Sequence, residues 1–168
     1  MLHDLLPQAT RQYCAQQNWP EDLVYRCHGI IGGIGSVRQQ IFTCVRWAMA
    51  SGAAILIPRP YARWQTNSTL GEEVKHRYGG QVEFDHFFDT EAFRATLKLI
   101  CPQMRLYEES ELGENRTIED IGEFKLPPIT SWNENLYQAT SRNFLSQHGP
   151  VPKDHVRLAW LGRHMKER

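Results

Sequence analysis

The sequence has no excess of charge of either sign. Nineteen Lys and Arg residues balance nineteen Asp and Glu residues in a chain of 168. A basic surface is what a protein needs to attract nucleic acid or an anionic membrane electrostatically. The composition therefore predicts neither nucleic acid nor a membrane surface as a partner.

Long hydrophobic runs are also missing. No run reaches the roughly 18 apolar residues that cross a membrane, and residues 1–18 lack the apolar centre of a signal peptide. We therefore expect no membrane segment and no targeting signal in the chain as it stands. The hydrophobic content of 41% and the aromatic content of 11% are typical of one globular domain.

Four cysteines are present, but no two of them have C-x-x-C spacing. Cys44 lies on the apolar face of a predicted helix, which favours a buried thiol. Cys14, paired with Cys27 or with Cys101, would form a disulfide in an oxidising compartment. The pairing and the redox state remain open at this point.

The segment Leu23–Pro58 predicts one strand–helix–strand unit. An apolar strand over Leu23–His28 leads into four glycines within seven residues, where the chain turns tightly. Ser36 is a favourable helix N-cap, and apolar residues then recur at helical spacing until Gly52 ends the helix. The continuous apolar run Ala53–Ile57 is typical of a parallel strand covered on both faces.

Strands and helices alternate along the rest of the chain. We predict a brief strand over Val82–Phe84 and further strands over Met104–Tyr107 and Asp154–Trp160. Other helices are predicted over Gln8–Gln17, over Gly71–Tyr78, from Asp89 or Thr90 to Ile100, and over Ser131–Gln147. The alternation predicts an α/β fold, a Rossmann-like parallel sheet with flanking helices.

Two further stretches complete the organisation of the chain. The acidic segment Glu108–Lys125 has little apolar periodicity and is interpreted as an exposed insertion. Asp85, His86 and Asp89 carry metal-binding donors, but their spacing fits no standard ligand pattern, so no metal site is predicted. We divide the chain into a polar lead-in, residues 1–22, and a single α/β domain, residues 23–168.

The glycine-rich turn is a candidate anion site, because free N–H groups and the helix dipole favour a phosphate at a helix N-terminus. It is not a dinucleotide fingerprint, since Arg38 stands where G-x-G-x-x-G needs its third glycine. No G-K-[ST] follows, which also excludes a P-loop. The Arg38 guanidinium can form paired hydrogen bonds to a phosphate or carboxylate. The alternatives are a turn that only packs helix on sheet and a solvated Arg38.

The connector Arg59–Leu70 follows the second strand of the unit. Loops at the carboxyl ends of parallel strands form ligand sites in open α/β sheets, so we expect this connector to help form a site. Arg63 and Trp64 are its candidate residues. Alternatively, Trp64 folds back to cover the sheet edge.

The stretch YRCHGIIGGIGSVRQQIFTCVRWAMASGAAILIP resembles the first βαβ unit of the O-fucosyltransferase-like glycosyltransferases, particularly a fungal branch. In that family a strand leads into a G-G-[LIF]-x-x-x-R-type turn, a helix of small and apolar residues and an L-[VI]-[LI]-P strand. The later stretches HFFDTEAF and CPQMRLY are also similar to the family pattern. The resemblance covers roughly Tyr25–Tyr107 and extends toward Trp160.

The resemblance implies a GT-B architecture with two Rossmann-like domains that face each other across a cleft. It implies GDP-fucose as donor substrate, a hydroxyl-bearing acceptor, and neither a metal nor a cofactor. It also implies residence in the Golgi or ER lumen, which suits the two glycosylation sequons at Asn67 and Asn115. The site residues that it implies are Gly32, Gly33, Gly35, Ser36 and Arg38.

Two departures from the family pattern qualify this expectation. No residue of the turn can act as a general base. His155 and Arg157 imitate the start of the family's H-x-R-x-[DE] motif, but no acid follows, and the second domain is missing from the chain. We therefore expect the amino-terminal half of such an enzyme, either truncated or a shortened paralogue. The alternatives are a non-catalytic interaction or regulatory protein and a small Rossmann-type nucleotide-dependent enzyme.

Overall fold

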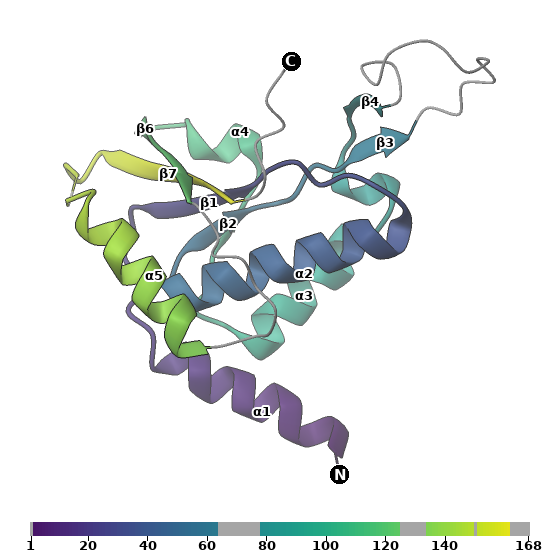
Figure 1. Cartoon of the computed structure of the whole chain (residues 1–168), viewed down its shortest axis with the longest axis horizontal. Helices are drawn as coiled ribbons and strands as arrows, with labels where there is room; N and C mark the ends of the chain where they lie inside the picture. The colour runs from purple at the N-terminus through teal and green to yellow at the C-terminus, as the bar shows by residue number, and fades with distance from the viewer. Residues whose placement is uncertain (1, 64–77, 125–133, 150, 162–168) are drawn as a thin grey trace.

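Figure 1 shows the computed structural model of the chain, which describes residues 2–63, 78–124, 134–149 and 151–161. Five parallel strands form the central sheet in the order β5-β2-β1-β7-β6. Across the sheet, their bounds are Leu106–Tyr107, Ala54–Leu56, Leu23–Cys27, His155–Leu161 and Thr117–Phe124. The predicted fold class, a Rossmann-like parallel sheet with flanking helices, is confirmed.

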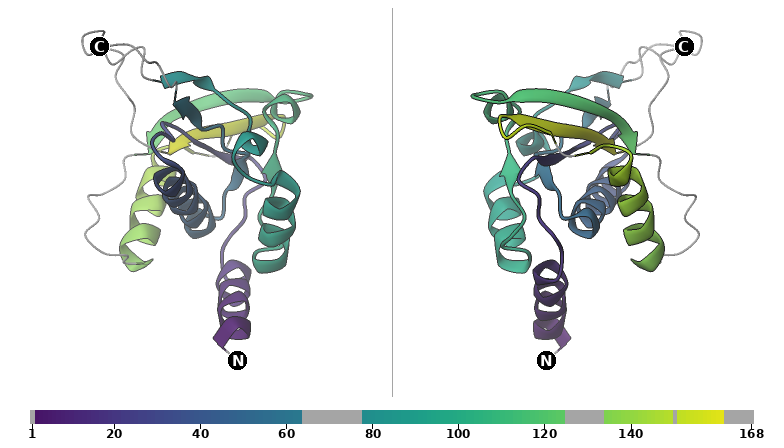
Figure 2. Two further views of the ribbon diagram at one scale, coloured as in Figure 1. Left: turned by 90° about the vertical axis from the view of Figure 1, so that its right-hand side faces the viewer. Right: turned by 90° about the vertical axis from the view of Figure 1, so that its left-hand side faces the viewer.

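Three long helices cover one face of this sheet (Figure 2). They are α2 (Ile34–Ser51), α3 (Thr90–Ile100) and α5 (Glu134–Ser146). They lie in the crossovers from β1 to β2, from β2 to β5 and from β6 to β7, which all step across the sheet in the same direction. Because such crossovers are right-handed, equal steps place their helices on the same face. The short helix α4 (Glu109–Leu112) lies on the opposite side (Figure 1).

The two faces of the sheet carry separate cores because successive strand residues point to opposite faces. On the helix side, Tyr25 and Cys27 of β1 pack in the larger core with residues such as Trp47 of α2. On the other side, a smaller core joins the sheet to Leu112 of α4; its sheet residues are Val24, Ala54, Leu56, Val156 and Leu158. The same alternation places Arg26 on the side of the smaller core.

Helix α2 begins earlier than predicted. Its N-cap is Gly33, so the prediction of Ser36 as N-cap is wrong. Ser36 lies inside the first turn, where its hydroxyl accepts a hydrogen bond of 2.9 Å from the Gln40 amide. The predicted stop is confirmed: Gly52 is the C-cap with φ +65°. A Cβ atom at Gly52 would lie 1.7 Å from the Asn18 carbonyl oxygen, which adds a steric reason for glycine.

All four cysteines form disulfides. Cys27 at the end of β1 is bonded to Cys44 of α2, so the prediction of a buried thiol at Cys44 is wrong. The alternation of β1 turns Cys27 toward α2 and leaves the two Cα atoms 5.9 Å apart. Cys14 is bonded to Cys101, one of the two pairings considered from the sequence. This bond ties helix α1 (Leu2–Ala15), in the predicted lead-in, to the end of α3.

The acidic segment is part of the sheet, so its interpretation as an insertion is wrong, whereas the expected exposure holds for most of its described side chains. It contains α4 and the edge strand β6, which pairs with β7 along its length. An edge strand has a neighbour on one side only, and charged side chains there protect it from pairing with other chains. For this reason a segment of acidic composition can form a regular edge strand.

A small hairpin separates β2 from α3. It pairs β3 (Tyr61–Arg63) antiparallel with β4 (Tyr78–Gln81). The predicted strand over Val82–Phe84 is wrong, because the chain turns after β4 into the 3-10 helix η2 (Phe84–His86). The helix predicted over Gly71–Tyr78 lies outside the described residues except for Tyr78, which belongs to β4. Within the described part of the chain, no helix has the length and apolar character needed to cross a membrane.

Candidate functional site

The strand order reverses between β1 and β7. The chain moves from β1 toward β2 and β5 on one side, whereas β7 and β6 lie on the other side. In open α/β sheets, ligands bind outside the carboxyl ends of the strands at such a switch point. Here the His28 N–H donates to the Leu161 carbonyl at 2.6 Å. A cavity of about 270 Å³ opens at this carboxyl edge.

Several elements contribute to the lining of the cavity. The end of β1 supplies Arg26, Cys27 and His28, and the end of β2 supplies Leu56 and Ile57. The remaining lining residues come from the loop after β2, the hairpin, α4 and β7, and they are Arg59, Tyr61, Gln81, Glu109 and Trp160. The lining is therefore a mixture of two cations, one acid, aromatic rings and apolar side chains.

Arg26 is a charged residue in an otherwise apolar strand. Its guanidinium carbon lies 4.6 Å from the centre of the Trp160 ring, and a nitrogen forms an ion pair with Glu109. Burial is the main cause that lowers the pKa of Arg26; the Asp120 carboxylate raises this pKa and the Arg59 charge lowers it. A partly desolvated cation at a cavity is well placed to bind an anion, because water screens the attraction less there.

Arg59 is the second cation of the cavity. It follows Pro58 just beyond the end of β2 and forms a 2.7 Å ion pair with Glu83. The Nε–H groups of Arg26 and Arg59 are buried and have no acceptor in the part of the chain that the structure describes. Buried donors are normally satisfied, and the oxygens of a phosphate or carboxylate would supply the acceptors.

The glycine-rich turn lies next to this cavity in the chain but does not line it. The Gln40 side-chain amide holds the turn by two hydrogen bonds to the Ile31 backbone, of 2.7 and 3.2 Å. Gly32 has φ +128°, a conformation that disfavours side chains. Arg38 is exposed on α2, with its guanidinium carbon 6.0 Å from the Phe42 ring centre. None of the implied site residues, Gly32, Gly33, Gly35, Ser36 and Arg38, is a lining residue of the cavity.

The connector after β2 contributes Arg59 and Tyr61 to the cavity. Its backbone is held in place, since the Tyr61 N–H donates to the Ile30 carbonyl at 2.9 Å. Arg63 ends β3, and its side chain lies outside the described residues, as do Trp64 and Asn67. The second sequon residue, Asn115, is exposed before β6.

No group of three potential metal-binding side chains occurs among the described residues. In the segment considered for metal, Asp89 is instead the N-cap of α3, where its carboxylate accepts a 2.8 Å hydrogen bond from the Ala92 N–H. This helix cap is confirmed. The His86 ring lies edge-on against Phe87, with ring centres 4.7 Å apart.

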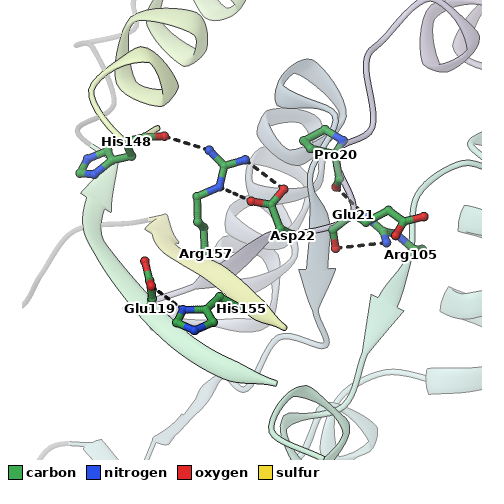
Figure 3. Close-up of polar contacts among 8 residues, drawn as sticks. All are labelled: Pro20, Glu21, Asp22, Arg105, Glu119, His148, His155 and Arg157. Atoms are coloured by element: carbon green, nitrogen blue, oxygen red, sulfur yellow. Dashed lines mark hydrogen bonds and ion pairs between the residues drawn. The ribbon is translucent and has the colours of Figure 1, made fainter. Parts of the chain in front are cut away.

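The amino edge of the sheet also holds arginines, but protein groups satisfy them (Figure 3). Arg157 donates to both carboxylate oxygens of Asp22, at 2.5 and 3.1 Å, and to the His148 carbonyl at 3.0 Å. Arg105 donates to the carbonyls of Pro20 and Glu21. These contacts connect strands to loops, and we interpret this edge as structural.

Comparison of the chain with known protein families, curated proteins and solved structures finds no match. Neither Arg26 nor Glu109 was predicted from the sequence as a site residue. The signal for Arg26 was a lone charge near the end of a buried strand. Glu109 carried no such signal, because it lies in a generally acidic segment.

Proposed function

We propose that the chain is a glycosyltransferase-like protein whose cavity at the carboxyl edge binds the phosphates of a nucleotide sugar. The observation that carries the proposal is the presence of Arg26 and Arg59 on one cavity at the switch point of the sheet. Guanidinium groups form paired, charge-assisted hydrogen bonds with phosphate oxygens. The O-fucosyltransferase-like resemblance of the chain suggests GDP-fucose as the donor and a hydroxyl group as the acceptor.

The size of the cavity suggests which part of the donor it would hold. Ligand pockets usually have volumes of about 300 to 1,000 Å³, so a cavity of about 270 Å³ suits a diphosphate better than a whole nucleotide sugar. In glycosyl transfer, negative charge grows on the departing diphosphate, and two fixed cations there would stabilise the transition state. The guanidinium groups are therefore proposed both to bind and to assist departure of the nucleoside diphosphate.

The proposed place of action is the lumen of the ER or Golgi. Disulfides persist in oxidising compartments, and two are present in this chain. The exposed Asn115 could carry a glycan there. Both features support residence in an oxidising compartment.

Calorimetric titration with GDP and GDP-fucose tests the binding proposal. We expect R26M/R59M to weaken binding at least about tenfold, because hydrogen bonds to charged groups contribute about 1.5 to 3 kcal/mol each. R46M, on the exposed side of α2, is the control and should bind as the wild type does. R38M tests the glycine turn: a loss confined to R38M would move the site to that turn and contradict the cavity proposal.

A non-catalytic interaction protein is the second candidate. Ile34 and Phe42 are each about half exposed on α2, four residues to either side of Arg38. Residues spaced in this way lie along one face of a helix, which is a common form of docking surface. Failure of GDP and GDP-fucose to bind, together with loss of a partner on I34S/F42S substitution, would favour this candidate.

A further inference from the structure

The two cavity arginines already have acidic partners. Glu109 pairs with Arg26, and Glu83 pairs with Arg59 at 2.7 Å. The acids are the more exposed members, with 49% and 65% of their side-chain surfaces accessible, against 25% and 37% for the arginines. Each pair therefore has an inner cation and an outer carboxylate in contact with water.

Within the described residues, each of the two carboxylates has a single side-chain partner. Glu109 is the first residue of α4, which has four residues, and Glu83 immediately precedes η2. Exposed ion pairs of this kind contribute little to stability, because water can replace the partner. Each glutamate can therefore leave its arginine at small cost.

The two cations repel each other, since the Arg59 charge lowers the pKa of Arg26. In the free protein each glutamate neutralises one of them. A monovalent anion would only replace one carboxylate on an arginine by a similar charged group, so the net free energy of binding would be small. An anion with two or more charges can contact both arginines, release both glutamates and offset the repulsion between the cations.

We propose that Glu83 and Glu109 are internal competitors, which occupy Arg59 and Arg26 in the ligand-free protein and are released when a multivalent anion binds. This inference rests on the proposed function, because it concerns the same cavity. The two acids then determine which anions bind: monovalent anions such as acetate do not displace the carboxylates, and so they are excluded from the arginines.

Titration with inorganic pyrophosphate tests this proposal. E83Q/E109Q should bind pyrophosphate about tenfold more tightly than the wild type, and each single variant about threefold, in line with two weak exposed pairs. E108Q is the matched control: Glu108 is adjacent in sequence and pairs with Arg94, outside the cavity lining. It removes one negative charge, as E109Q does, so a purely long-range electrostatic effect would appear equally in E108Q and in E109Q.

A second double variant separates competition from charge. E83D/E109D keeps both charges but shortens each side chain by one methylene group, which lengthens and weakens both ion pairs. It should therefore bind pyrophosphate more tightly than the wild type does, but less tightly than E83Q/E109Q, which also lacks both negative charges. Affinity gained in the glutamine variant but not in the aspartate variant would overturn the proposal, because charge alone would then explain the gain.

The remaining outcomes separate this proposal from the proposed function. Equal pyrophosphate affinity in the wild type and in both double variants would overturn the competitor role and leave the anion site in place. Absence of binding in all of these proteins, each shown to be folded by circular dichroism, would overturn both.

Discussion

The two edges of the sheet use the same residue type in different ways. At the amino edge, Arg157 is 9% exposed in its side chain and donates to Asp22 and His148 (Figure 3). At the carboxyl edge, Arg26 and Arg59 have solvated acidic partners and buried Nε–H groups for which the described residues supply no acceptor. The comparison indicates that unused donors, rather than the presence of charge, distinguish the proposed binding edge from the other edge.

The two disulfides also differ, both in their position relative to the cavity and in the length of the loop that each one closes. Cys14–Cys101 ties α1 to the end of α3 just before β5, whereas Cys27–Cys44 lies beside the cavity at the end of β1. The first spans 87 residues and the second 17. A disulfide that closes a longer loop removes more entropy from the unfolded chain. Stability should therefore depend more on the bond that lies away from the cavity.

Removal of each disulfide should give the largest effects. We expect C14A/C101A to lower the free energy of unfolding by about 4 to 5 kcal/mol and C27A/C44A by about 3 kcal/mol, from the entropy of the closed loops. Urea denaturation monitored by circular dichroism measures both. A larger loss in C27A/C44A would contradict the view that the carboxyl edge contributes less to stability.

Arginine substitutions compare the edges directly. R157M removes the partner of Asp22 and should cost about 3 kcal/mol, because a largely buried carboxylate loses its cation. R26M, a substitution of the same type at the cavity, should change stability by no more than about 1 kcal/mol, since its partner Glu109 is exposed. Equal losses in urea denaturation would show that both edges are structural.

Tyr25 lies between the edges and provides a pH test of the core. Its hydroxyl donates to Ser51 at 2.8 Å, Ser51 donates to Ser141 at 2.8 Å, and burial raises the pKa of Tyr25 from 10.0 to about 12. The unfolded chain loses this proton first, so the stabilisation is complete below pH 10 and disappears as the pH rises to 12. We expect the wild type to lose about 2 kcal/mol over this interval.

Y25F is the control for this pH dependence, because phenylalanine cannot ionise. Its unfolding free energy should lack the component that the wild type loses between pH 10 and pH 12. Parallel curves for the two proteins would contradict a buried, neutral Tyr25 in the folded state.

Local patterns in the sequence predicted much of the fold. Apolar runs located β1, β2 and β7, and Gly52 and Asp89 marked the end of α2 and the start of α3. These predictions succeeded because neighbouring residues determine caps and apolar periodicity. The strand β6 was missed because an edge position tolerates the acidic side chains that indicated a solvated loop.

The candidate site could be predicted only in part. The connector after β2 was expected to help form a site, and it supplies Arg59 and Tyr61. The residues chosen within it were Arg63 and Trp64, because nothing local showed which side chains would turn toward the strand ends. Glu109 lies 83 positions from Arg26 in the sequence, so their ion pair could not be read from spacing.

The sequence by itself determined the α/β class and the strand–helix–strand unit, because local apolar periodicity carries this information. Tertiary structure alone decided the disulfide pairing, the place of β6 and the convergence of Arg26, Arg59 and Glu109 on one cavity. These features depend on the order of strands in the sheet. That order is set by packing between distant segments, for which a single sequence contains no local signal.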